Sequence, residues 1–232
     1  MKKLLFFWIM TVFAFNGFSL GKDTAVCEIY LIRHARVELK KPLLCTSSKA
    51  AELLDQYDDL PVLDFDPLPV KALLGDSVRA VYTSALPRST ETAGILFPET
   101  DTLYSNSLFN EYDLSVISVP LIPLPYVAWT TLSRFFWNIG LNNHDESRFK
   151  AYKRMLRATD LIEKQAIEYR HIVLVAHGYL IAEMKRELKK RGWELEIDQG
   201  HKNLAVAKLT KAPPPLPRST QQDSGGAAFA KP

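Results

Sequence analysis

The sequence predicts an α/β fold, a three-layer α/β/α sandwich with a mostly parallel central sheet. Short runs of β-branched and aliphatic residues, typical of strands buried on both faces, occur at 28–32, 80–83, 171–176 and 204–209. Segments with apolar residues at helical spacing separate these runs. This alternation is the pattern of strand–helix–strand units, whose strands pair in parallel.

The composition fits one domain with terminal extensions. The 232 residues are 47% hydrophobic and 24% charged, which allows a sizeable core. The formal net charge is only +3, so the balance indicates neither nucleic acid nor an acidic polymer as a partner. We assign residues 22–210 to the folded domain and expect 211–232, with a triple proline, Ser, Gln and Gly, to be a disordered tail.

Residues 1–21 have the pattern of an export signal. Lys2 and Lys3 precede an apolar run from Leu4 to Phe15, and small residues follow at 19 and 21, the spacing that a signal peptidase recognises. The run is shorter than the roughly 20 residues of a membrane span, so we expect cleavage and a periplasmic or secreted protein. An uncleaved anchor is the alternative, and a buried N-terminal helix is a third interpretation. Without Lys2 and Lys3 the basic count falls from 29 to 27, against 26 acidic residues.

The two cysteines, Cys27 and Cys45, would lie in an oxidising compartment after export. The loop that carries Cys45 is long enough to reach Cys27, but nothing in the sequence requires it. We favour two buried thiols over a disulfide.

Helices are expected between the strands. The first has Ala50, Leu53, Leu54 and Tyr57 on its inner face. Gly192 is expected to end the last one. The predicted helices are 47–57, 70–74, 87–96, 146–169 and 179–191, and 102–104 is a further short strand.

Charged side chains and imidazoles stand where the buried runs end. Arg33 and His34 follow the first run, Arg88 opens the helix after the second, and His177 follows the third. Ligands of open α/β sheets bind at the carboxyl ends of the strands. The guanidinium group of arginine and the backbone N–H groups at a helix N-terminus can donate hydrogen bonds to the oxygens of a phosphoryl group. An imidazole can attack the phosphorus atom. These residues therefore predict a site for a phosphorylated ligand.

Three motifs in this order resemble those of the histidine phosphatase superfamily, in its phosphoglycerate mutase-like branch. Residues 31–35, Leu-Ile-Arg-His-Ala, resemble the nucleophile signature, with Ala35 where glycine is usual. Residues 83–93 resemble the second motif, whose arginine falls on Arg88. Residues 175–178 resemble the motif of the second histidine. The resemblance spans 26–209 and implies a phosphoglycerate mutase-like fold.

The resemblance also implies roles for five residues. His34 would accept the phosphate as phosphohistidine, which water then hydrolyses. Arg33, Arg88 and His177 would bind the phosphate, with His177 protonated. Glu111 occupies the place of the acid that protonates the leaving oxygen, and it would be kept protonated by apolar neighbours. A solvated loop glutamate is the structural alternative.

Departures from the family's pattern bear on the reaction. In the superfamily's other arrangement the proton-donating acid directly follows the second histidine, but here Gly178 occupies that position. The acid is therefore expected elsewhere in the chain. Asp113 is the alternative to Glu111. Val37 and Lys40 replace the hydroxyl residue and asparagine usual in mutases. We therefore expect a phosphomonoesterase that acts on a small phosphorylated substrate without a metal or organic cofactor. A phosphoglycerate mutase-type transferase and a non-catalytic envelope protein that binds phosphorylated ligands are the alternatives.

The segment 116–140 combines prolines with large aromatic residues. Three prolines between 120 and 125 indicate a non-helical cover, and Trp129 and Trp137 supply apolar area. Because it follows Glu111 in sequence, we expect it to roof the pocket with an apolar wall for the leaving group. A packing segment over the sheet is the main alternative, and a membrane-surface patch is another.

Overall fold

A mixed, mostly parallel sheet forms the centre of the molecule. The computed structural model describes residues 26–74, 78–100, 103–142 and 146–213. Within these ranges the sheet has six strands: β1 Cys27–Arg33, β2 Ala80–Thr83, β3 Leu103–Ser105, β4 His171–Ala176, β5 Glu194–Asp198 and β6 Val206–Lys211. Their order across the sheet is β3-β2-β4-β1-β6-β5, and the first four pair in parallel. Strand β6 continues the sheet antiparallel to β1, and the edge strand β5 pairs antiparallel to β6.

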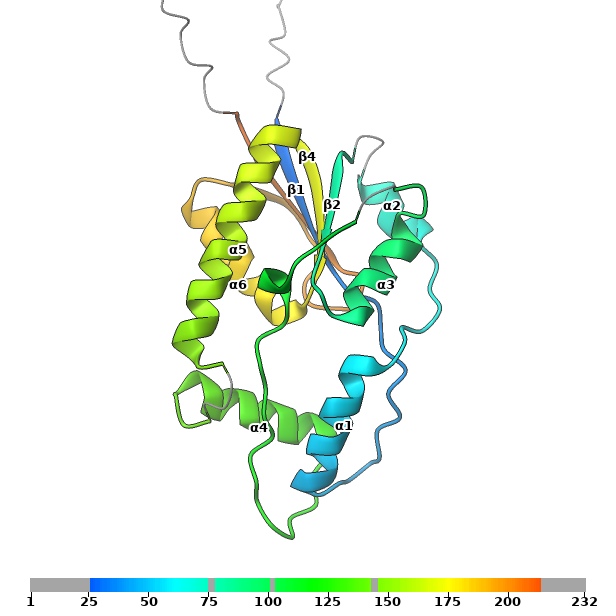
Figure 1. Ribbon diagram of the computed structural model, residues 1–232, viewed down its shortest axis with the longest axis vertical. Helices are drawn as coiled ribbons and strands as arrows, with labels where there is room; N and C mark the ends of the chain where they lie inside the picture. Colours follow the sequence, from blue (N-terminus) through cyan, green and yellow to red (C-terminus); the bar gives the residue numbers. More distant parts are fainter. Residues whose placement is uncertain (1–25, 75–77, 101–102, 143–145, 214–232) are drawn as a thin grey trace, which may run out of the picture.

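Helices cover both faces of this sheet (Figure 1). One face packs against α5 Arg148–Tyr169 and α6 Gly178–Lys190, and the other against α2 Leu68–Leu74 and α3 Pro87–Leu96. Alternate side chains of β1 enter the two cores, with Leu31 on the first face and Ile32 on the second. The predicted three-layer sandwich is confirmed, and the continuous apolar runs reflect strands covered on both sides.

Two further helices, α1 Ser47–Asp59 and α4 Tyr126–Asn138, lie beyond the carboxyl ends of the parallel strands (Figure 1). They share a small core of their own, in which Ala50 and Leu53 of α1 pack with Trp129 of α4. The indole of Trp129 donates to the carbonyl of Cys45 at 2.8 Å, which ties α4 to the loop before α1. This pair of helices therefore covers the sheet edge at which ligands bind in such folds.

Three elements were absent from the sequence prediction. The prolines of 116–125 do keep that stretch out of regular structure, but α4 begins directly after Pro125. The edge strand β5 was missed because polar and apolar residues alternate in it. A short 3-10 helix, η1 Ser107–Phe109, follows β3.

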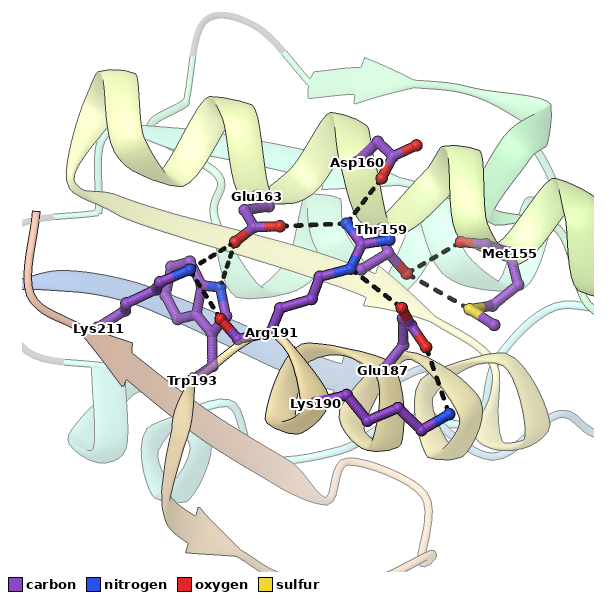
Figure 2. A network of polar contacts seen from close by, with 9 residues as sticks. All are labelled: Met155, Thr159, Asp160, Glu163, Glu187, Lys190, Arg191, Trp193 and Lys211. Atoms are coloured by element: carbon purple, nitrogen blue, oxygen red, sulfur yellow. Dashed lines mark hydrogen bonds and ion pairs between the residues drawn. The ribbon is translucent and has the colours of Figure 1, made fainter. Parts of the chain in front are cut away.

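A network of ion pairs joins α5, α6 and β6 at the end of α6 far from His177 (Figure 2). Arg191 contacts Asp160 at 2.6 Å and Glu163 at 3.1 Å. Glu163 also accepts from the ammonium of Lys211 at 2.9 Å and from the indole of Trp193 at 2.9 Å. The prediction that the tail begins at 211 is therefore wrong, because Lys211 closes β6 and anchors it to α5.

The export signal predicted at 1–21 lies outside the described residues, as does the tail from 214 onwards. No helix among the described residues is long and apolar enough to cross a bilayer. Cys27 and Cys45 are both buried free thiols.

Candidate active site

The parallel strands bring the predicted residues to one edge of the sheet. In the pairing of β1 with β4, Arg33 lies opposite Ala176, and the amide of His34 donates to the carbonyl of Ala176 at 2.9 Å. His177 follows Ala176 and stands at the start of α6. The ring centroids of His34 and His177 are 5.1 Å apart. The expected convergence of the two histidines is therefore present.

The imidazole of His34 is held in one tautomer. Its Nδ1 lies 2.6 Å from the carbonyl oxygen of Ala35, which can only accept a hydrogen bond, so Nδ1 carries the proton and Nε2 keeps its lone pair. The side chain is only 2% exposed. Burial lowers the pKa of His34 the most, and repulsion from Arg88 and Arg33 lowers it further, to about 3. The hydrogen bond to the Ala35 carbonyl acts in the opposite direction and raises this pKa. His34 is therefore a neutral imidazole with a free Nε2, the form required of a nucleophile.

Hydrogen bonds from distant parts of the chain fix the backbone around His34. The side-chain amide of Asn203 donates to the carbonyl of His34 at 2.9 Å. The hydroxyl of Thr92, on α3, accepts from the amide of Ala35 at 2.9 Å and donates to the carbonyl of Arg88 at 2.6 Å. The two segments that carry His34 and Arg88 are thus joined through one buried threonine.

His177 is buried between hydroxyl groups. Its Nε2 forms a hydrogen bond with the Ser84 hydroxyl at 2.7 Å and lies 3.4 Å from that of Ser89. Burial, with repulsion from Arg88, His34 and Arg33, holds the pKa of His177 well below its usual range. In the site without an anion, burial and the nearby cations therefore favour the neutral form of His177, whereas the expected protonated form concerns the site with phosphate bound.

Two guanidinium groups complete the cluster. Arg33 packs against Gly178, where a Cβ atom would lie only 3.2 Å from the Cζ and Nε atoms of the arginine, and its Nη1 donates to the carbonyl of His201. Arg88 is 3% exposed, and its Nη1 donates to Asp58 at 2.6 Å. The lack of a side chain at Gly178 therefore allows the close approach of Arg33 to the start of α6.

Several buried nitrogens of this cluster have no hydrogen-bond partner among the described residues. They are Nε of Arg33, Nε of Arg88 and Nδ1 of His177. Buried polar atoms are nearly always paired, and buried like charges are costly without an anion between them. A phosphoryl group fits this arrangement, since it offers oxygen acceptors and negative charge to both guanidinium groups.

Glu111 lies near the same edge, in a setting different from the one expected. Its carboxylate accepts from the amides of Tyr112, at 3.1 Å, and of Tyr179 and Leu180, both at 3.3 Å. The last two amides belong to the first turn of α6, where N–H groups have no acceptor within the helix. Glu111 is half-buried, between the buried rings of Phe109 and Tyr112 in sequence, and its carboxylate is bound by backbone amides rather than surrounded by apolar groups alone. Asp113 is exposed, and its carbonyl accepts from Arg134.

Arg154 of α5 holds the segment that carries Glu111. Its guanidinium binds both carboxylate oxygens of Glu146 at 2.7 Å. It also donates to the carbonyls of Leu108 at 3.0 Å, Asn110 at 2.6 Å and Glu111 at 3.2 Å. One arginine thus binds three backbone carbonyls within residues 108–111, a contact that no local sequence pattern indicates.

A cleft of about 690 Å³ opens beside Arg33 and Glu111. Helix α4 lines it, as the position of 116–140 after Glu111 suggested, but with mostly polar side chains: Thr130, Thr131, Arg134, Phe135 and Asn138. Helix α6 contributes the opposite wall with Gly178, Tyr179, Ala182, Glu183 and Arg186. Trp129 and Trp137 are each 1% exposed and belong to the core. The two tryptophans therefore do not form the predicted apolar wall, although Phe135 of the same helix lines the cleft.

Helix α1 also reaches the site, which the sequence did not indicate. The ring of Tyr57 lies 4.8 Å from Cζ of Arg88, and its centroid is 6.3 Å from that of His34. Asp58 is the ion-pair partner of Arg88 described above. In the described part of the chain, no group of three or more His, Cys, Asp or Glu side chains is arranged to hold a metal ion.

No family model matches the chain, and no curated protein matches it. Solved structures do. A mycobacterial hydrolase has 18% identity and a TM-score of 0.53, covering 80% of this chain and 92% of that one. A mycobacterial glucosyl-3-phosphoglycerate phosphatase has 18% identity and a TM-score of 0.51, covering 80% and 90%. The chain therefore shares the α/β fold of these structures, the phosphoglycerate mutase-like fold that the sequence motifs predicted.

Proposed function

We propose that this protein is a phosphomonoesterase that hydrolyses a small phosphate ester through a phosphohistidine on His34. The observation that carries the proposal is the free Nε2 of a neutral, buried His34 beside the unpaired guanidinium nitrogens of Arg33 and Arg88. Arg88 is buried and Arg33 half-buried beside two histidines, and Asp58 is paired with Arg88. An anionic substrate adds countercharge to this cationic cluster.

The reaction has two steps. In the first, Nε2 of His34 bonds to phosphorus while the bond to the ester oxygen breaks, and the leaving oxygen takes a proton from Glu111. In the second, water attacks the phosphohistidine, returns a proton to the Glu111 carboxylate and releases inorganic phosphate. Arg33 and Arg88 hold the equatorial oxygens in both steps. A bound dianion would also favour the protonated form of His177.

Two observations favour hydrolysis over transfer to a second alcohol. Val37, where mutases have a hydroxyl residue, is buried and pairs with Val62 in an isolated bridge. Lys40 is exposed. The similarity in fold to a glucosyl-3-phosphoglycerate phosphatase agrees with hydrolysis, although it concerns the fold alone. Among the residues that line the cleft, Thr130 and Arg134 could bind hydroxyl or charged groups of a leaving group, and Phe135 offers an apolar contact.

The test is turnover of a panel of phosphomonoesters by the purified domain, with and without a chelator. We expect release of phosphate that the chelator does not reduce, and we expect His34→Ala to abolish it. Thr83→Val is the matched control, because it removes a buried hydroxyl at the end of β2 that has no hydrogen-bond partner among the described residues. Tight phosphate binding without turnover of any ester would instead support the non-catalytic alternative.

A further inference from the structure

The last turn of α1 lies against the arginine proposed to bind phosphate. The carboxylate of Asp58 accepts from Nη1 of Arg88 at 2.6 Å. The side chain of Asp58 is 52% exposed, whereas that of Arg88 is 4% exposed. The carboxylate therefore approaches a buried cation from the solvent side, next to the ring of Tyr57.

The position of Asp58 is not explained by the stability of its own helix. The last turn of α1 carries Asp58 and Asp59, Asp55 lies just before it, and the turn has no basic residue. The C-terminal end of a helix bears partial negative charge, so carboxylates there are unfavourable. Such a conflict with local preference is typical of functional positions. Here the compensating group is the guanidinium of Arg88.

We propose that Asp58 is a built-in anionic competitor that weakens the binding of inorganic phosphate to Arg88 and so speeds product release. This inference rests on the proposed function. The Nε atom of Arg88 has no partner among the described residues, so a phosphoryl group can bind there while Asp58 stays on Nη1. The two anions then share one guanidinium and repel each other.

The substitution Asp58→Asn separates charge from geometry. An asparagine oxygen can accept the same hydrogen bond from Nη1, so the orientation of Arg88 is kept while the negative charge is removed. We expect phosphate to bind about fivefold more tightly, the size of effect for a partly exposed charge acting through a shared partner. Asp59→Asn is the matched control, because it removes an exposed carboxylate from the same turn.

The experiment measures the dissociation constant of inorganic phosphate by calorimetry and its inhibition constant during ester hydrolysis. The proposal predicts that both constants fall about fivefold in Asp58→Asn and change less than about twofold in Asp59→Asn. A gain in affinity cannot result from damage to the fold.

Each other outcome is decisive. Equal or weaker phosphate binding by Asp58→Asn refutes the competitor role while hydrolysis by the wild type stands. Equal tightening in both variants also refutes it, because the effect would then come from net charge alone. A wild type that neither binds phosphate nor hydrolyses esters refutes the proposed function, and the inference with it.

Discussion

The neutral state of His34 predicts a specific dependence of stability on pH. In the folded protein its pKa is about 3, whereas an unfolded histidine titrates near 6.5. Since the folded pKa is the lower one, unfolding takes up a proton below pH 6.5. This histidine therefore has no effect on stability at higher pH, and it destabilises the fold increasingly as the pH falls from 6.5 towards 3.

The perturbation is His34→Gln, which removes the titrating group. When the pH falls from about 7.5 to about 4.5, the titration of His34 lowers the free energy of unfolding of the wild type by roughly 2.6 kcal/mol. The variant lacks this titrating group and does not lose this contribution. The figure changes little if the folded pKa lies a unit higher, because pH 4.5 would still lie above it. Carboxylates common to both proteins cancel in the difference.

The assay is urea unfolding of both proteins at the two pH values. We expect the free energy of unfolding of His34→Gln, relative to the wild type, to rise by about 2.6 kcal/mol on acidification. Thr83→Val, which changes a buried but non-titrating residue, should differ from the wild type by the same amount at both values. A difference for His34→Gln that is independent of pH would refute a buried, neutral His34.

Other predictions test the remaining parts of the account. Glu111→Gln should slow esters with poor leaving groups far more than activated aryl esters, which need no protonation; equal losses in a steady-state comparison would indicate a structural role at the start of α6. Gly178→Ala should raise KM about fivefold with little change in kcat. The new Cβ atom would lie 3.2 Å from the guanidinium of Arg33 and displace it, so that roughly 1 kcal/mol of charge-assisted binding is lost. An unchanged KM would mean that Arg33 does not bind substrate. The mature protein should begin near Lys22, and N-terminal sequencing that recovers intact Met1 from soluble cytoplasm would contradict export.

Much of the fold follows from local pattern. The buried strands were predictable because parallel strands covered on both faces must be apolar throughout, as Ile29 to Ile32 and Ile172 to Val175 are. Once these strands are parallel, the residues that follow them must meet at one edge. The convergence of His34 and His177 could therefore be predicted without a structure.

Helix α4 was missed although its sequence carries the signal. Tyr126, Trp129, Ser133 and Trp137 are all buried and recur at helical spacing. The prolines before them drew the interpretation towards an irregular cover, yet a proline just before a helix is compatible with its start. The error also misplaced the two tryptophans in the pocket wall.

The contacts of Asp58 and Glu111 could not be predicted from local sequence. Asp58 reaches Arg88, 30 residues away, only because Ala50 and Leu53 seat α1 against α4 in a separate core. Glu111 meets amides 68 and 69 residues further along the chain, where α6 begins. The periodicity of a local sequence does not show which helix N-terminus the carboxylate of a loop residue will contact.

The central claim is that His34 carries the phosphoryl group. The most direct measurement is rapid quenching during turnover of a radiolabelled phosphomonoester, followed by mapping of the acid-labile, alkali-stable label to a peptide. The account predicts label on the peptide that contains His34 in the wild type and none in His34→Ala. Label that persists in His34→Ala, or that maps to His177, would contradict it.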